Sequence, residues 1–136
     1  MIGFQTFSHV SVTVTDVEKA RWFYGRVLGL HELPRPDFDF PGIWYGLAGD
    51  VQLHVIVNEQ LTRTEAEREG FEVRCPHFAL WTTDADRTAR ELAASGARVH
   101  DFVSTPTGLR QLFVKDPDGN MIEFIGPTGA ARAKTD

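Results

Sequence analysis

Residues 9–30 read HVSVTVTDVEKARWFYGRVLGL, and their hydrophobic period changes partway along. The first six residues alternate apolar with mostly small polar side chains, which is the period of a half-buried β-strand. Residues 15–18 (TDVE) then have the Ser/Thr-x-x-Glu spacing of a capping box. The apolar residues that follow recur at helical spacing until Gly29. The stretch therefore predicts a strand that leads directly into a helix.

Three further strands complete this first arrangement. We expect them near residues 30–33, 43–47 and 51–57, with a proline-rich loop after the first and a short Ala-Gly-Asp turn before the last. The predicted order is β-α-β-β-β. Its last strand, VQLHVIV, is apolar except for Gln52 and an imidazole, His54, near its centre.

The same order recurs in the second half of the chain. Strands are predicted at 76–81, 98–103, 109–115 and 120–125, with a helix between the first two that ends at Gly96. His9 and His77 both open the first strand of a copy, 68 positions apart, whereas His54 and Glu123 lie on the last strands, 69 positions apart. The chain is thus an internal repeat with a one-residue insertion or deletion between the copies.

The length of 136 residues favours one domain of class α+β. We assign a single domain over residues 1–126, made of module one at about 6–58, a polar connector at 59–75 and module two at about 76–126. Residues 127–136 are small and polar, and are expected to form a flexible tail.

The composition favours a small-molecule ligand. The net charge of −5 comes without any Lys/Arg cluster, so neither nucleic acid nor an anionic membrane surface is an expected partner. Cys75 is the single cysteine, which excludes an intrachain disulfide, and no signal-peptide pattern is present. A cytoplasmic location is therefore expected.

Each copy carries two residues able to bind a metal ion. Strand alternation places His9, His54, His77 and Glu123 on the side away from the more apolar face of their strands. A lone strand histidine is usually satisfied by ordinary hydrogen bonds, but four candidates in matching places favour a shared site. Glu123 is the sharpest case, because a carboxylate buried within NMIEFI must be paired or bound to metal.

These stretches resemble the vicinal oxygen chelate superfamily of glyoxalases, bleomycin-resistance proteins and extradiol dioxygenases. The resemblance covers residues 6–126 and is carried by the opening stretch quoted above, by PHFALWTTD at 76–84 and by LFVKDPDGNMIEFI at 112–125. It implies two tandem βαβββ modules that form a curved mixed half-barrel sheet with helices outside. It also implies one divalent metal held by His9, His54, His77 and Glu123, and a homodimer as the default assembly.

Three imidazoles and one carboxylate suit Zn, Ni, Co, Fe or Mn. Four protein ligands would leave two positions of an octahedron, enough for a substrate that chelates through two oxygens. We therefore expect lyase or isomerase chemistry of the glyoxalase type, in which the metal stabilises an enediolate and Glu123 serves as the catalytic base. In family glyoxalases the position of His54 more usually holds Glu or Gln, which is a departure in this chain.

Two alternatives remain open. With His54 beside the metal rather than on it, a ring-cleaving dioxygenase becomes possible, and a non-catalytic drug-binding resistance protein is the other class. For substrate binding the candidates are Trp44 as a pocket wall, and Arg35 and Arg110 as anion clamps. The remaining histidines, His31 and His100, are expected on the surface.

Overall fold

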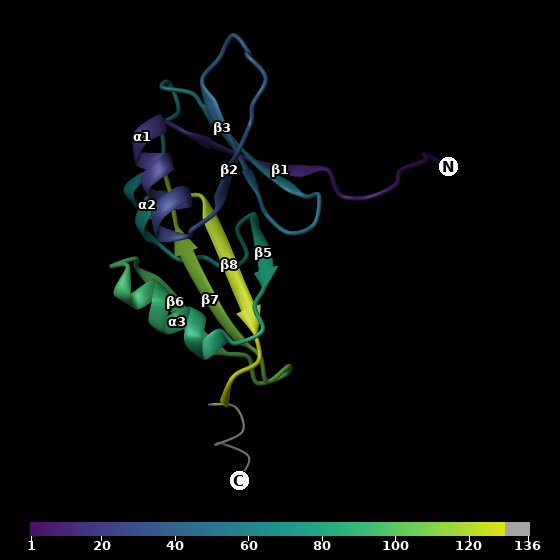
Figure 1. The fold of residues 1–136 in the computed structure, drawn as a ribbon. Helices are drawn as coiled ribbons and strands as arrows, with labels where there is room; N and C mark the ends of the chain where they lie inside the picture. The colour runs from purple at the N-terminus through teal and green to yellow at the C-terminus, as the bar shows by residue number, and fades with distance from the viewer. Residues whose placement is uncertain (130–136) are drawn as a thin grey trace. The chain divides into compact units, whose positions relative to one another are not determined.

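The protein is described by a computed structural model over residues 1–129. The chain divides into two compact units, Met1–Thr62 and Arg63–Asp136. Each unit contains one four-stranded mixed sheet (Figure 1). The α+β class and the tandem repeat predicted from the sequence are confirmed.

Unit 1 has the strand order β1-β4-β3-β2, in which β1 runs parallel to β4 and the other pairs are antiparallel. Its elements are β1 (His9–Val14), α1 (Val17–Ala20), the π-helix η1 (Arg21–Val27), β2 (His31–Leu33), β3 (Gly42–Gly46) and β4 (Gln52–Val57).

The helix of unit 1 begins one residue later than the capping-box spacing predicts. Asp16 is the N-cap, and its Oδ1 accepts hydrogen bonds from the backbone N–H groups of Glu18 and Lys19. After one α-helical turn the chain widens into η1, where the backbone N–H of Leu28 donates to the carbonyl of Phe23. An apolar period near four residues does not distinguish this π-helix from an α-helix, so the sequence predicted one continuous α-helix.

Unit 2 repeats the topology with the order β5-β8-β7-β6, and β5 runs parallel to β8. Its elements are α2 (Glu65–Glu69), β5 (His77–Trp81), α3 (Ala85–Ala94), β6 (Val99–Val103), β7 (Arg110–Lys115) and β8 (Met121–Gly126). The helix α3 packs against β6, β7 and β8.

The predicted connector packs against unit 2. Lys115 Nζ donates to the carbonyl of Glu67 over 2.6 Å, and Arg98 forms an ion pair with Glu69. Phe71 then stacks on the ring of His100 at 5.7 Å. Residues 63–75 of the predicted connector therefore belong structurally to the second copy, whereas residues 59–62 belong to the first.

Each sheet has a helix-side face that forms a core. The largest buried side chains of these cores include Tyr45, Ile43, Leu53, Leu112 and Ile122 on the strands and Tyr24 on η1. In unit 1 the rings of Tyr24 and Tyr45 lie 6.1 Å apart. No helix within residues 1–129 is long and apolar enough to cross a lipid bilayer. The opposite face of each sheet carries the candidate site residues.

Candidate functional site

The strand registers place the predicted ligands at equivalent points in the two units. His54 pairs in register with Trp44, and Glu123 pairs with Phe113. In each case the ligand candidate lies on the last strand, with an aromatic residue beside it on the preceding antiparallel strand. The sequence repeat is therefore also a repeat of side-chain positions on the open face of each sheet.

In unit 2, His77 and Glu123 are brought together. His77 Nε2 lies 3.1 Å from Glu123 Oε1, and His77 Nδ1 lies 2.8 Å from the carbonyl oxygen of Cys75. Glu123 is buried, with 5% of its surface exposed. The ring of Phe113 meets His77 edge-on at 5.3 Å. An imidazole and a nearly water-excluded carboxylate therefore face each other.

Hydrogen-bond chemistry identifies what this pair can hold. A carbonyl only accepts, so Nδ1 of His77 carries the proton that it donates to Cys75. In the neutral imidazole Nε2 is then an acceptor, and it faces a second acceptor on Glu123. Two acceptors at this distance need a proton or a cation between them. Two ligand atoms at right angles, each about 2.1 Å from one ion, lie roughly 3.0 Å apart, so the pair fits a metal.

Gln111, which the sequence reasoning missed, completes this arrangement. Its Nε2 donates to Glu123 Oε2 over 2.9 Å, so the carboxylate is held at one oxygen while the other faces His77. Such outer contacts orient metal ligands in proteins. Strand alternation offered the signal, because Gln111 and Phe113 share a face of β7 and Phe113 lies directly opposite Glu123.

In unit 1, His54 lies between two other rings. Its imidazole stacks on Trp44 with centroids 4.1 Å apart and on His9 with centroids 4.0 Å apart. His9 Nδ1 contacts the hydroxyl of Ser8 at 2.9 Å, and its Nε2 has no partner within residues 1–129. The free Nε2 of His9 is therefore available as a ligand atom.

His54 is held more firmly than a free ligand would be. Its Nε2 lies 2.9 Å from Oε1 of Gln52, so ligation through that nitrogen requires Gln52 to turn away. Burial, and then the neighbouring His9 and Arg35, lower the pKa of His54, which favours the neutral imidazole that metal ligation needs. The structure thus presents His54 as an imidazole aligned between two rings, with a lowered pKa and with its Nε2 in contact with the side-chain oxygen of Gln52.

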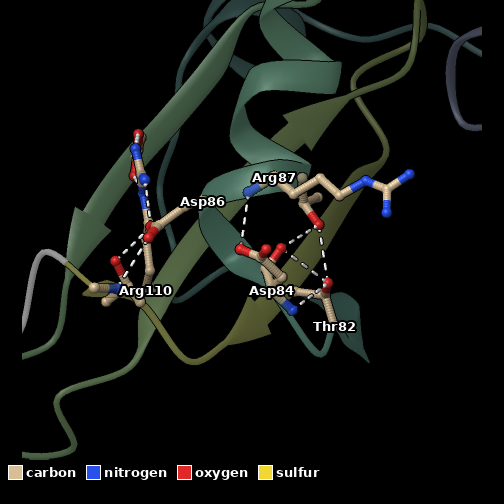
Figure 2. A network of polar contacts seen from close by, with 9 residues as sticks. Thr82, Asp84, Asp86, Arg87 and Arg110 are labelled. Atoms are coloured by element: carbon tan, nitrogen blue, oxygen red, sulfur yellow. Dashed lines mark hydrogen bonds and ion pairs between the residues drawn. The ribbon is translucent and has the colours of Figure 1, made fainter.

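Arg110, predicted as an anion clamp for substrate, lies on the helix side of its sheet, opposite the face that carries Glu123. Its guanidinium donates to both carboxylate oxygens of Asp101, and to Oδ1 of Asp86 on α3 over 2.8 Å (Figure 2). Alternation along β7 puts it opposite Gln111, on the side covered by α3. This arginine fastens α3 to the sheet, and we do not retain it as an anion clamp for substrate.

Asp86 also fixes the start of the predicted flexible tail. Its Oδ1 accepts from the hydroxyl of Thr128 over 2.5 Å and its Oδ2 accepts from the backbone N–H of Gly129 over 2.9 Å. Residues 128 and 129 are therefore anchored, whereas the rest of the predicted tail, 130–136, lies outside the described residues. The hydrogen bonds from Thr128, Gly129 and Arg110 lower the pKa of Asp86 to about 2.

Replacing Asp86 with Asn should destabilise the fold in a pH-dependent way. A carboxyl whose pKa is depressed on folding stabilises the protein above its unfolded pKa, and that contribution disappears as the pH falls towards 2. We expect Asp86→Asn to lower the free energy of unfolding by about 1–2 kcal/mol at pH 7, allowing for partial exposure. Urea denaturation should show this difference shrinking below pH 4. Asp50→Asn, at an exposed turn, serves as the control; equal effects from both variants would contradict the assignment.

The other two substrate-binding candidates lie in unit 1. Trp44, predicted as a pocket wall, shares the open face with His54, whereas its neighbour Tyr45 points to the core. Arg35 lies over the rings of Phe38 and Phe40, with its carbon Cζ 4.9 and 5.0 Å from their centroids. The structure therefore gathers a cation and several aromatic rings in the unit that contains His9 and His54.

Within residues 1–129 no three His, Cys, Asp or Glu side chains are arranged as a metal centre. The candidate ligands instead occur as two pairs, one in each unit. Only the pair in unit 2 is in mutual contact through polar atoms, and the pair in unit 1 is in contact through its ring faces.

Comparisons with known proteins identify the architecture. The family model of the Glyoxalase/Bleomycin resistance protein/Dioxygenase superfamily matches residues 6–124. A protein of the glyoxalase family from Bacillus anthracis is 27% identical, with a TM-score of 0.76 over 93% of this chain and 98% of its own. No curated protein sequence matches the chain.

More distant structures share the fold. A glyoxalase/dioxygenase from Nostoc punctiforme is 24% identical, with a TM-score of 0.72 over 90% of this chain and 91% of its own. The fosfomycin resistance protein FosX from Listeria monocytogenes is 16% identical, with a TM-score of 0.69 over 96% of this chain and 99% of its own.

Proposed function

Because the chain belongs to the Glyoxalase/Bleomycin resistance protein/Dioxygenase superfamily, we propose that it is a divalent-metal-dependent lyase or isomerase of the glyoxalase type. The proposed ligands of one Zn, Ni, Co, Fe or Mn ion are His9, His54, His77 and Glu123. The substrate is a small molecule that chelates through two oxygens. The assembly is a homodimer, in which a site takes its two ligand pairs from one chain or from two.

One observation carries this proposal. His77 Nε2 and Glu123 Oε1 face each other at 3.1 Å while the other imidazole nitrogen is committed to a backbone carbonyl. A carbonyl partner on the second nitrogen is the usual way in which a protein fixes the tautomer of a metal-bound histidine. The pair therefore has the donor set, the spacing and the outer contact of a half-site.

The metal, when bound, acts as a Lewis acid on the paired substrate oxygens and lowers the pKa of the adjacent C–H. The chain's own residues then position the groups around it. The carbonyl of Cys75 holds the ring of His77, and Gln111 holds Oε2 of Glu123. Glu123 is the proposed base, and we assign proton transfer to Oε2 because Oε1 faces the metal-binding imidazole. The ring of Phe113 shields this pair from water on one side.

A second candidate function rests on the contact between His54 and Gln52. If that contact persists, the ligand set is two histidines and one carboxylate, which is the facial triad of non-haem iron oxygenases. Ring-cleaving dioxygenase activity would then follow, with three open positions for a catecholate and O₂. His54 would instead align the substrate ring or His9.

Metal analysis of protein purified without chelators, followed by a substrate screen, tests the proposal. We expect one divalent ion for each proposed site, and turnover of methylglyoxal with a thiol rather than of a catechol panel. His54→Ala should then lose metal and activity together. Full catechol cleavage by His54→Ala would instead establish the dioxygenase, and metal-free protein that cannot be loaded would refute both enzymes.

The contact from Gln111 gives a prediction of its own. Gln111→Met keeps the length of the side chain but removes the donor to Glu123 Oε2, so the carboxylate loses its orientation. We expect Co²⁺ affinity to fall about 10- to 100-fold, measured by calorimetry, with an altered visible Co²⁺ spectrum. Gln60→Met, at an exposed position, is the control. Equal affinity for Gln111→Met and the control would remove Gln111 from the site.

A further inference from the structure

Like Arg26, Arg63, Arg68 and Arg90, Arg35 forms no ion pair within residues 1–129, but its guanidinium lies over two aromatic rings. Arg21, Arg74, Arg87, Arg98 and Arg110 each form an ion pair. Arg35 forms none within residues 1–129, although Asp37 and Asp39 are in the same loop. Its Nη2 donates to the carbonyl of Phe40 over 2.9 Å, its Nε is buried without a partner, and its Nη1 makes no hydrogen bond in the described part of the chain.

The guanidinium is nevertheless held in a defined place. The rings of Phe38 and Phe40 stack on each other 5.4 Å apart, and both lie within 5.0 Å of the guanidinium carbon. An ideal Cβ at Gly42 would meet the carbonyl oxygen of Val55 first, and would lie 3.0 Å from Arg35 Nη2 and 3.2 Å from its Cζ. The guanidinium therefore packs closely against β3 at Gly42.

The guanidinium lies near the open face of the unit 1 sheet, because the ring of Phe38 contacts both Arg35 and Trp44. Gly42 and Trp44 are two residues apart on β3 and so share a face, and Trp44 stacks on His54. The register supports the same placement: Gly42 pairs with Ile56 as Gln111 pairs with Ile125 in unit 2. Arg35 therefore contacts Gly42, the residue of unit 1 that corresponds by register to Gln111 of unit 2.

The guanidinium of Arg35 is partly buried but has no negatively charged partner in the described residues. Buried charges are normally paired, and a buried N–H without a partner costs free energy. The aromatic faces stabilise the cation but leave its in-plane N–H donors free, and those donors match carboxylate and phosphate oxygens. The guanidinium of Arg35 is therefore held in place with free donors that can bind an anion.

We propose that Arg35 binds an anionic group of the substrate, so that the substrate is a small carboxylate, phosphonate or phosphate that also bears two metal-chelating oxygens. This inference rests on the proposed function, because the guanidinium of Arg35 lies near His9 and His54, which are proposed ligands of the metal. The rings of Trp44 and Phe38, 6.0 Å apart, flank the same place.

Phenylphosphonate is a suitable probe, with neutral benzamide as the comparison, and binding can be followed by calorimetry on metal-free and on Co²⁺-loaded protein. We expect phenylphosphonate to bind at least tenfold more tightly than benzamide. Arg35→Met should remove that preference, and Arg35→Lys should keep part of it. Arg26→Met makes the same charge change at an exposed site and should bind like the natural chain. Circular dichroism checks that each variant is folded.

The Co²⁺ spectrum links the anion to the proposed metal. Phenylphosphonate should perturb the visible spectrum of the loaded protein at concentrations at least tenfold lower for the natural chain than for Arg35→Met. Equal binding to Arg35→Met and the natural chain would overturn the inference, and so would binding that depends on Arg35 but leaves the spectrum unchanged. Neither result affects metal loading, which alone tests the proposed function.

Discussion

Glu123→Gln is expected to abolish binding of a divalent metal. The substitution keeps the shape of the side chain but removes the charge that faces His77 Nε2 at 3.1 Å inside a nearly water-excluded site. Losing an outer contact already costs about 10- to 100-fold in metal affinity, so losing a ligand should exceed about 100-fold. Calorimetry with Co²⁺ and metal analysis of the purified protein measure the loss. Glu59→Gln, at an exposed position, should retain the metal, and full occupancy in Glu123→Gln would exclude the carboxylate as a ligand.

The same variant can assign the site to one chain or to two. If the protein is the proposed homodimer, co-expression of Glu123→Gln with His9→Ala produces mixed dimers in which one chain lacks a proposed ligand in unit 2 and the other lacks one in unit 1. If a site combines units from two chains, one site in each mixed dimer is intact, and about a quarter of the natural metal content returns. If each chain supplies its own four ligands, no metal returns.

Gly126→Ala should give the largest loss of stability. Gly126 ends β8 against the chain that leaves β5, and an ideal Cβ there would lie 2.2 Å from the carbonyl oxygen of Thr82 and 2.8 Å from its Cγ2. Backbone must move to admit the methyl group, which we expect to cost about 3 kcal/mol. The melting temperature should fall by roughly 10 °C. Gly3→Ala, with nothing within 4 Å, is the control; an unchanged melting temperature for Gly126→Ala would contradict the close approach.

Most of the fold could be predicted from the hydrophobic period of the sequence and from the glycine and proline residues that end its elements. The alternation in β1, the apolar run of β4 and the turn that ends at Gly119, whose φ is +87°, were each visible as residue types in order. The π-helix was not visible, because within its seven residues the apolar spacing does not separate an i→i+5 from an i→i+4 hydrogen-bond pattern. The packing of residues 63–75 on unit 2 also escaped, since it depends on hydrogen bonds from distant residues such as Lys115.

The sequence identified a site residue best where burying its side chain without a partner would cost much free energy. It did worst where the question was which face of a strand a residue occupies. A carboxylate in NMIEFI demanded a partner, and the structure gives Glu123 two. Arg110 and Gln111 are neighbours on β7 whose side chains point to opposite faces. Arg110 was predicted in the site because of its charge, although it faces α3. The charge of a residue does not show which face of the sheet it occupies. Strand alternation does: Gln111 is two residues before Phe113 and therefore shares its face with Phe113 and Glu123.

Because the connector packs on the second copy, the boundary of the sequence repeat and the boundary of the packed unit fall at different residues. By sequence, the copies begin with the strands that open on His9 and His77. By packing, the division falls between Thr62 and Arg63, more than a dozen residues before the second of those strands. The stretch that repeats in sequence is therefore shorter than the stretch that packs as one unit. A second copy excised at His77 would lose the segment that covers the ring of His100, so a cut intended to yield a self-standing half belongs at residue 63.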